Sequence, residues 1–206
     1  MEKFIRLTAL AAVLDRPNVD TDLIIPKQFL KNIERHGYGQ HAFHDLRFKP
    51  DGTPDPDCPL NQARYQGAGA LVSRENFGCG SSREQAVWAL MDYGFKAVIA
   101  PSFSDIFRNN SLKNGLLPAE LPTGAVADLI RLIEETPGFE LSLDLEARTV
   151  TGPMDFSAGF AIDPYARELL LNGWDDISLT LEKEDRLAAY ETGHNHSWLA
   201  AVRDLN

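Results

Sequence analysis

The sequence predicts a single mixed α/β domain over residues 1–206, and two observations carry this prediction. Two apolar stretches typical of buried strands, Ala68–Ser73 and Lys96–Ala100, flank a helical stretch over Glu84–Tyr93. Together they span about 30 residues, the size of a right-handed parallel crossover unit. Further along, Phe139–Leu145 alternates apolar and polar side chains with a period of two, as a half-exposed strand does. With 44% hydrophobic and 24% charged residues, the chain has the composition of a globular protein and is long enough to bury a core.

The N-terminal part contains one predicted strand and a long irregular segment. Phe4–Leu14 is apolar enough for a strand, and the polar run Asn18–Asp22 that follows predicts a loop. Pro26 suits the first turn of a short helix that ends at about Glu34. From His36 to Arg64 the chain is rich in Gly, Pro, His and Asp. Long irregular segments of this kind are often binding loops, so we expect a substrate loop over about 31–64.

Two further helices are predicted between the crossover unit and the alternating strand. Phe103–Leu112 has the pattern of a short helix that Asn109-Asn110 and Gly115 interrupt. Thr123 is expected to cap an amphipathic helix. Its apolar residues recur at helical spacing and predict one buried face: Val126, Leu129, Ile130 and Ile133.

The C-terminal part is predicted to be helical. Asp163-Pro164 begins a helix that Gly173 ends. A C-terminal helical extension is expected over about 182–206, with one helix over Glu182–Glu191 and a second near Trp198–Val202.

Charge and hydropathy exclude several classes of protein. The net charge is -10, from 30 acidic and 20 basic residues, so the basic face that nucleic-acid binding requires is not expected. No stretch approaches the roughly 20 apolar residues of a membrane span, and Met1–Leu14 lacks the pattern of a signal peptide. A cytoplasmic protein that binds neither nucleic acid nor membrane is therefore expected. Cys58 and Cys79 are the chain's two cysteines, too few for a disulfide framework and too few to hold an iron–sulfur cluster, which takes about four thiolates.

The segment Arg74–Glu84 carries the strongest functional signal. It follows a predicted buried strand and opens a predicted helix, which is where α/β proteins bind ligands. Unpaired N–H groups and the helix dipole favour an anion at that position. Its glycines allow close approach of the backbone, and Arg83 offers a fork suited to a carboxylate. Together with the hydroxyls of Ser81 and Ser82, these features indicate a site for a small anion.

Four other motifs can be compared with the residue spacing of this segment, and only the capping box matches it. Ser81-x-x-Glu84 and Ser82-x-x-Gln85 both match a capping box, which needs no ligand at all. A dinucleotide-binding fingerprint would need a third glycine where Arg83 stands, and a phosphate-binding P-loop would need Gly-Lys-Ser/Thr. A nucleophile elbow centred on Ser82 would need glycine at Glu84. The anion site and the helix cap therefore remain as alternatives.

Histidine clusters offer a weaker metal hypothesis. His36, His41 and His44 have spacings that could suit a metal ion, as could His194 and His196. No cysteine or carboxylate pattern accompanies either group, so ordinary loop histidines are the favoured interpretation.

The motifs of the chain resemble a known family over most of its length. Gly80–Glu84 resembles the active-site turn of the swivelling domain in the aconitase superfamily, and Glu75–Glu84 resembles the small subunits of bacterial isopropylmalate isomerases. Other runs that resemble the same small subunits, in the same order, are Asn18–Asp22, Ile25–Leu30, Tyr93–Phe95, Ile99–Phe103, Asn114–Pro118 and Asn172-Gly173. The resemblance implies a swivelling β/β/α domain of the aconitase C-terminal type.

The resemblance also implies roles for individual residues. The first serine of the Ser-Ser-Arg run is the base of the family, which makes Ser81 the catalytic residue here. Ser82 and Arg83 would hold a substrate carboxylate. Thr21 and Asp22 match a Thr-Asp pair of the active site, with Thr21 expected to contact substrate and Asp22 to join the hydrogen bonds around the base.

The family's substrate loop corresponds to the segment after the first helix. Arg35, His36 and Tyr38 fall within it and are expected to bind substrate. Two residues depart from the family pattern: Gln85 stands where histidine is usual, and His36 where threonine is usual. These departures leave the reaction class unchanged and leave the substituent on C3 of the malate open.

The implied activity is a hydro-lyase shared between two chains. A [4Fe–4S] cluster on a separate large subunit would act as Lewis acid, while this chain would bind no cofactor or metal of its own. The substrate would be a small dicarboxylate, with isomerisation of 2-isopropylmalate to 3-isopropylmalate in leucine biosynthesis as the expected reaction. Two alternatives stay open: a related hydro-lyase subunit for methylmalate or dimethylmalate, and a non-catalytic anion-binding module in which Ser81 only caps a helix.

Overall fold

The computed structural model describes residues 1–30, 35–174, 189–190 and 192. The chain divides into two compact units, residues 1–173 and 174–206, and the first of these carries the sheet and helices described below. Predicted helices over 182–191 and 198–202 fall largely or wholly outside the described residues, as does the segment 31–34 of the predicted substrate loop. The single-domain organisation stays a prediction.

One sheet of seven strands, in the order β4-β3-β2-β1-β5-β6-β7, forms the centre of the first unit. Strands β1 to β4 pair in parallel, whereas β1-β5, β5-β6 and β6-β7 pair antiparallel. The strand bounds are β1 Arg6–Leu14, β2 Ala70–Ser73, β3 Ala97–Ala100, β4 Leu117–Glu120, β5 Glu140–Asp144, β6 Thr149–Thr151 and β7 Ser157–Gly159. The sheet therefore has a parallel half and an antiparallel half that share β1.

Strand β1 joins the two halves because its two ends have different partners. Its first half pairs with β5, from Arg6 opposite Asp144 to Leu10 opposite Glu140, and its second half pairs with β2. Burial follows the partner: side chains of the first half are exposed or half-buried, whereas the last four residues are all buried. A parallel sheet covered on both faces needs such continuous apolar runs, and an antiparallel one with a solvated face needs alternation.

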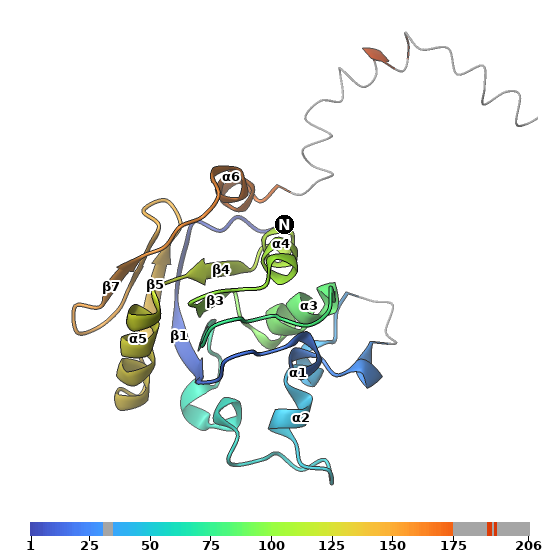
Figure 1. Ribbon diagram of the computed structural model, residues 1–206, viewed down its shortest axis with the longest axis vertical. Coiled ribbons are helices and arrows are strands. Elements are labelled where there is room, and N and C mark those ends of the chain that lie inside the picture. The colour runs from blue at the N-terminus through green and yellow to red at the C-terminus, as the bar shows by residue number, and fades with distance from the viewer. Residues whose placement is uncertain (31–34, 175–188, 191, 193–206) are drawn as a thin grey trace, which may run out of the picture. The chain divides into compact units, whose positions relative to one another are not determined.

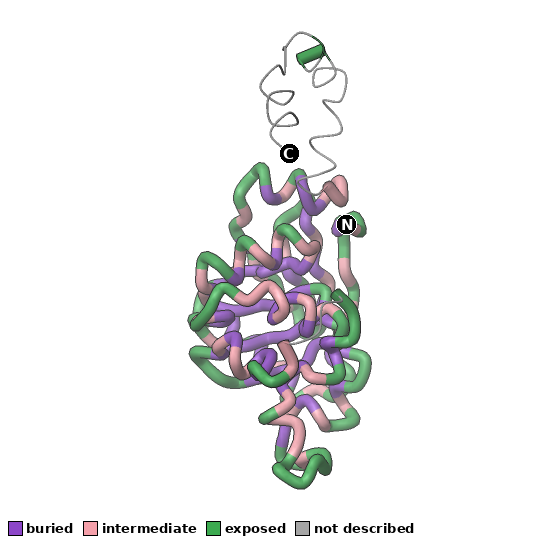
Figure 2. Tube along the Cα trace, turned by 90° about the vertical axis from the view of Figure 1, so that its right-hand side faces the viewer, coloured by how far each residue is buried: buried purple, intermediate pink, exposed green. Residues whose placement is uncertain are grey.

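Helices cover the parallel half on both sides (Figure 1). Helices α3 and α4 are the crossovers from β2 to β3 and from β3 to β4, and they pack on each other, while α5 packs against β1, β2 and β3. Figure 1 shows α3 and α4 on one side of β1 and α5 on the other. The helix bounds are α1 Thr21–Ile24, α2 His44–Arg47, α3 Glu84–Tyr93, α4 Asp105–Asn114, α5 Thr123–Glu135 and α6 Pro164–Asn172. Buried residues gather in the middle of the first unit (Figure 2), and they include all four residues of β2 and all four of β3.

Several predicted boundaries were wrong, each for a local reason. The loop predicted over Asn18–Asp22 contains the start of α1, because the Asp20 side chain accepts a hydrogen bond from Leu23 N at 2.7 Å and caps a short turn. Asn109-Asn110 does not interrupt α4, which begins after Ser104 and ends at Gly115, whose backbone is left-handed. Thr123 is the first residue of α5 rather than its cap, which is Pro122. The helix expected to begin at Pro26 is described only as a 3₁₀ turn over 27–29.

Candidate active site

The turn between β2 and α3, residues 74–83, is called the serine turn here, and it brings two distant segments together. Its backbone has positive φ at Asn76, Gly78 and Gly80. A Cβ at Gly78 would lie 2.1 Å from the ring of Phe107, so only glycine fits between the turn and α4. The turn also hydrogen-bonds to the segment before α1, with Gly78 N donating to Val19 O at 2.7 Å. The polar run before α1 therefore lies against the turn, about 60 residues away in sequence.

Ser81 is paired with Thr21 across this junction. Their hydroxyl oxygens lie 3.2 Å apart, and Ser81 N donates to the Thr21 hydroxyl oxygen at 3.2 Å. The Thr21 hydroxyl also lies 3.4 Å from the Ser81 carbonyl oxygen. Thr21 is 1% exposed, whereas Ser81 is exposed. A buried threonine thus holds an accessible serine at the surface of the turn.

Arg83 forms the second link across the junction. Its Nη1 donates to Asp22 Oδ1 at 2.5 Å, and Lys27 Nζ lies 3.9 Å from Asp22 Oδ2. The Arg83 side chain is largely buried and that of Asp22 is about half exposed. Hydrogen bonding to Arg83, with smaller help from the charges of Arg83 and Lys27, lowers the pKa of Asp22 against the opposing effect of burial. Asp22 is therefore held as a carboxylate. The guanidinium of Arg83 lies beside it, directly after Ser81 and Ser82 in the turn.

The capping-box interpretation of the two serines is wrong. The residue that caps α3 is Arg83, with extended backbone and no hydrogen bond from its side chain to the helix. Ser81 and Ser82 are both exposed, and the Ser82 side chain forms no hydrogen bond within the described part of the chain. The two hydroxyls therefore lie before the N-terminus of the ten-residue helix α3 and do not cap it. The dipole and the N–H groups of a helix N-terminus favour an anion at this position.

The predicted substrate-loop residues lie along α3 rather than at its start. Tyr38 is 1% exposed, and its backbone N donates to Asp92 Oδ2 at 3.0 Å. The His36 side chain is 91% exposed, with Nδ1 3.9 Å from Asp92 Oδ1. The Arg35 guanidinium carbon lies 5.2 Å from the centre of the Trp88 ring. Asp92 follows the first residue of α3 by about eight positions, roughly 12 Å along the axis. The structure thus brings together Thr21, Asp22, Ser81 and Arg83 but not these three.

Metal-binding arrangements are not found among the described residues. No group of three or more His, Cys, Asp or Glu side chains there could hold a metal ion. His41 instead stacks on Phe29 at 4.0 Å, and His44 is tilted against the same ring. His194 and His196 lie outside the described residues. Burial raises the pKa of both cysteine thiols, which disfavours the thiolate that a metal would need.

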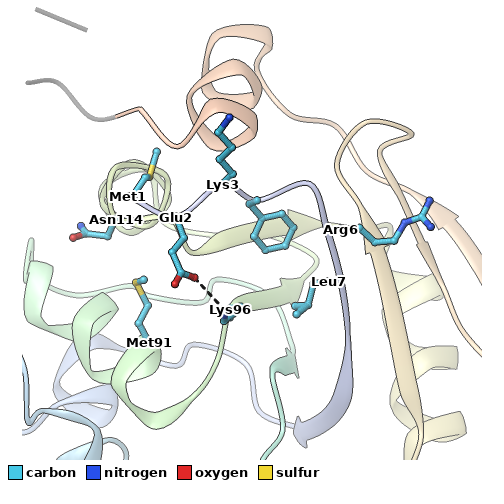
Figure 3. Close-up of a pocket in the computed structure, with 10 residues that line it drawn as sticks. Met1, Glu2, Lys3, Arg6, Leu7, Met91, Lys96 and Asn114 are labelled. Atoms are coloured by element: carbon cyan, nitrogen blue, oxygen red, sulfur yellow. Dashed lines mark hydrogen bonds and ion pairs between the residues drawn. The ribbon is translucent and has the colours of Figure 1, made fainter. Parts of the chain in front are cut away.

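A cavity of about 330 Å³ lies elsewhere in the first unit, and none of its lining residues belongs to the serine turn (Figure 3). Its lining includes Phe4, Met91 and Asn114, with the ion pair between Glu2 and Lys96 at 3.3 Å. No helix in the described ranges is long and apolar enough to cross a membrane.

The fold and the motif both have known counterparts. The aconitase C-terminal domain family matches residues 1–124, and the LeuD_N family matches residues 127–164. A 3-isopropylmalate dehydratase small subunit from Dechloromonas aromatica is 52% identical over 200 residues, covering 93% of this chain and 94% of that protein. The chain belongs to the family of 3-isopropylmalate dehydratase small subunits. A small subunit from Leptospira interrogans is 51% identical over 206 residues, covering 98% of this chain and 100% of that relative.

A solved member of the family supports the same assignment. The crystal structure of a 3-isopropylmalate dehydratase protein from Methanocaldococcus jannaschii superposes with a TM-score of 0.65 at 28% identity, covering 92% of this chain and all of that one. The α/β fold of the aconitase C-terminal type is thereby confirmed, as is membership of a family of hydro-lyase small subunits. Because these relatives are small subunits, a large subunit is implied as the partner.

Sequence reasoning missed part of the arrangement. Thr21 was expected to contact substrate, and nothing in its local sequence indicates that its hydroxyl holds Ser81. Lys27 beside Asp22 was also missed, because the apolar run Leu23–Pro26 separates the two residues in sequence and the short helix α1 brings their side chains together. A third link, from Glu84 to Asn114, joins the turn to α4 through a residue that no motif singled out for the site.

Proposed function

We propose that this chain is the small subunit of a 3-isopropylmalate dehydratase in which Ser81 transfers the proton. The observation that carries the proposal is the pairing of the exposed Ser81 hydroxyl with the buried Thr21 hydroxyl at 3.2 Å. A serine that does not cap its helix, and whose exposed hydroxyl is held in one place before the helix N-terminus, is suited to act on a bound molecule. The proposal extends the family assignment to the residues that perform the reaction.

The proton moves between two carbons of the substrate through the Ser81 oxygen. As an alkoxide, Ser81 removes the proton from C3 of 2-isopropylmalate while the hydroxyl leaves C2. The proton is then held on the Ser81 oxygen until it returns to C2, while the hydroxide released from C2 adds to C3, so that Ser81 is an alkoxide again at the end of the cycle. A serine is too weak an acid for this at neutral pH unless its anion is stabilised. Thr21, the N–H groups at the start of α3 and the charge of Arg83 supply that stabilisation.

Arg83 binds a substrate carboxylate in this proposal. Asp22 Oδ1 accepts a hydrogen bond from a single terminal nitrogen of Arg83, which leaves other donors of the guanidinium for a second anion. Asp22 thereby orients Arg83 and takes part in the hydrogen bonds around the base. Ser82, exposed beside it, is placed to bind the same carboxylate. The substrate carboxylate then fixes the reacting carbon relative to Ser81.

The iron–sulfur cluster belongs to the partner in this proposal. The described residues offer no donor set for it, and two cysteines are too few in any case. When bound on the large subunit, the [4Fe–4S] cluster supplies a Lewis acid for the substrate oxygens. The active site then lies between two chains, which fits the exposure of Ser81 and Ser82. The cytoplasmic location stays a prediction.

The isopropyl substrate is proposed over smaller malates. Ser81 and the residues that bind the carboxylate contact the malate core that all candidates share, so the alkyl substituent, on C2 of 2-isopropylmalate and on C3 of its isomer, must be contacted by other residues. Arg35 and His36 are exposed and stay candidates for that contact, whereas Tyr38 has its ring in the core and is expected to support the loop. An apolar pocket separates substrates that differ by one methyl group by about 1–3 kcal/mol, so measurable activity on methylmalate and dimethylmalate is expected.

Reconstitution tests the proposal. The chain is co-expressed with a large subunit of the family, purified anaerobically and assayed with 2-isopropylmalate, methylmalate and dimethylmalate. We expect the complex to hold the cluster and turn over isopropylmalate most efficiently, and the chain alone to be colourless and inactive. A stoichiometric cluster and turnover with this chain alone would refute the assignment of the cluster to the large subunit. A higher kcat/KM for methylmalate or dimethylmalate would refute isopropylmalate as the preferred substrate.

A further inference from the structure

A polar cluster of Glu84, Asn114 and Trp88 ties the serine turn to the neighbouring helix. Asn114 Nδ2 donates to Glu84 Oε1 at 2.8 Å and to Asn110 O at 2.8 Å, and Trp88 Nε1 donates to Asn114 Oδ1 at 3.0 Å. Both N–H groups and the carbonyl of the Asn114 amide are thus engaged. The amide can take only one orientation, because a flip would place its carbonyl against a carboxylate and its NH₂ against a donor.

The position of Glu84 gives this cluster its importance. Glu84 is the first residue of α3 and follows Arg83 directly. The turn is therefore anchored at three points: Ser81 on Thr21, Arg83 on Asp22, and Glu84 on Asn114. The first two anchors come from the start of α1 and the third from the last residue of α4.

Trp88 extends the cluster to the substrate loop. The centre of its ring lies 5.2 Å from the guanidinium carbon of Arg35 and 5.9 Å from the centre of the Tyr38 ring. Its indole nitrogen donates the hydrogen bond to Asn114. The loop also packs tightly at Gly39, where a Cβ would lie 2.5 Å from the backbone carbonyl of Asp92. The substrate loop therefore packs on α3 at Trp88 and Asp92, and the serine turn leads directly into the same helix.

We propose that Asn114 is a positioning residue: through Glu84 and Trp88 it fixes the serine turn relative to the substrate loop. The inference rests on the proposed role of Ser81 and adds a residue that does not touch substrate. A displacement of about 1 Å at the reacting atoms can cost 10²-fold in rate, so an anchor next to Arg83 is suited to influence turnover.

A charge-swap cycle tests the proposal in the complex with the large subunit. Asn114→Asp places two carboxylates against each other. Combining it with Glu84→Gln restores the bond with its direction reversed, because the introduced glutamine amide can donate to the new carboxylate. Asn114 borders the cavity of Figure 3, so water can reach its side chain and the variants are expected to fold. Asn109→Asp, on an exposed residue of the same helix, is the matched control.

We expect Asn114→Asp to lower kcat about tenfold with little change in KM, the double variant to recover most of the loss, and Asn109→Asp to keep wild-type kcat. Amide hydrogen exchange of residues 81–87, measured on the chain alone, should accelerate in Asn114→Asp and recover in the double variant. Wild-type kcat in Asn114→Asp, or a double variant no better than the single one in both measurements, would overturn the proposal. An inactive wild-type complex would instead refute the proposed function, and the exchange data would still decide the anchor.

Discussion

Replacing Thr21 by valine removes a hydroxyl while keeping the volume of the side chain. Thr21 is 1% exposed, and its hydroxyl has three contacts with Ser81, at 3.2, 3.2 and 3.4 Å. Because valine fills the same space, no cavity forms, and the cost comes from the Ser81 N–H left without its partner. An unsatisfied donor costs about 1–3 kcal/mol, and the long distances and partial exposure here place the expected loss at about 1–2 kcal/mol. Each kcal/mol lowers Tm by about 2–4 °C in a domain of this size.

The effect on turnover should be larger than the effect on stability. Thr21 is the side-chain partner of the Ser81 oxygen, and removing one donor to a developing oxyanion costs about 10²–10³-fold in kcat. We therefore expect Thr21→Val to lower kcat by about 10²-fold with KM changed little. Thr21→Ser is the matched control, because it keeps the hydroxyl and loses one buried methyl group, worth about 1 kcal/mol.

Steady-state kinetics of the reconstituted complex and thermal unfolding of the chain separate the two effects. Both variants should lower Tm by a few degrees, roughly in proportion to about 1–2 kcal/mol, but only Thr21→Val should lose turnover. Equal kcat in Thr21→Val and wild type, or a greater loss in Thr21→Ser than in Thr21→Val, would refute the pairing of Thr21 with the base.

Three other substitutions probe Arg83 and His36. Arg83→Lys should raise KM more than it lowers kcat, since a point charge replaces a planar fork; a fall in kcat alone would contradict a role in substrate binding. Arg83→Gln should raise the pKa of Asp22, because hydrogen bonding to Arg83 is the main cause that lowers it. A lowered pKa stabilises the fold above the ordinary carboxyl pKa of about 4, and this contribution is lost as pH falls through the lowered value. Wild type should therefore resist acid unfolding to lower pH than Arg83→Gln, and identical acid midpoints would contradict the link. His36→Thr should change the ratio of kcat/KM between isopropylmalate, methylmalate and dimethylmalate, and unchanged ratios would show that this position does not set specificity.

The parallel half of the fold could be predicted from the sequence because local signals agree there. Continuous apolar runs indicated β2 and β3, and Gly94 ends α3 as expected, with φ of 122°. The antiparallel half was harder, since β6 and β7 are three residues each and carry little periodicity. Strand β4 contains Pro118, which argues against a strand until its place at the sheet edge is known.

The site was predictable as a motif but not as an arrangement. Glycines, serines and Arg83 lie within one segment, so their spacing could be compared with known patterns. The hydroxyl of Thr21 and the amide of Asn114 reach this segment from 60 and 30 residues away, through pairings that only the folded chain makes. The depth of Tyr38 likewise depends on how its loop packs on α3, which no local pattern records.

The assignment of the base is tested most directly by replacing each serine of the turn separately. Ser81→Ala and Ser82→Ala remove the same atom from adjacent exposed residues, and neither serine caps α3, so both variants should keep the stability of the wild type. In the complex with an intact cluster, we expect Ser81→Ala to lose about 10²–10⁴-fold in kcat with KM little changed. Ser82→Ala should mainly raise KM. A Ser81→Ala complex that keeps kcat within a few-fold of wild type would show that another group transfers the proton.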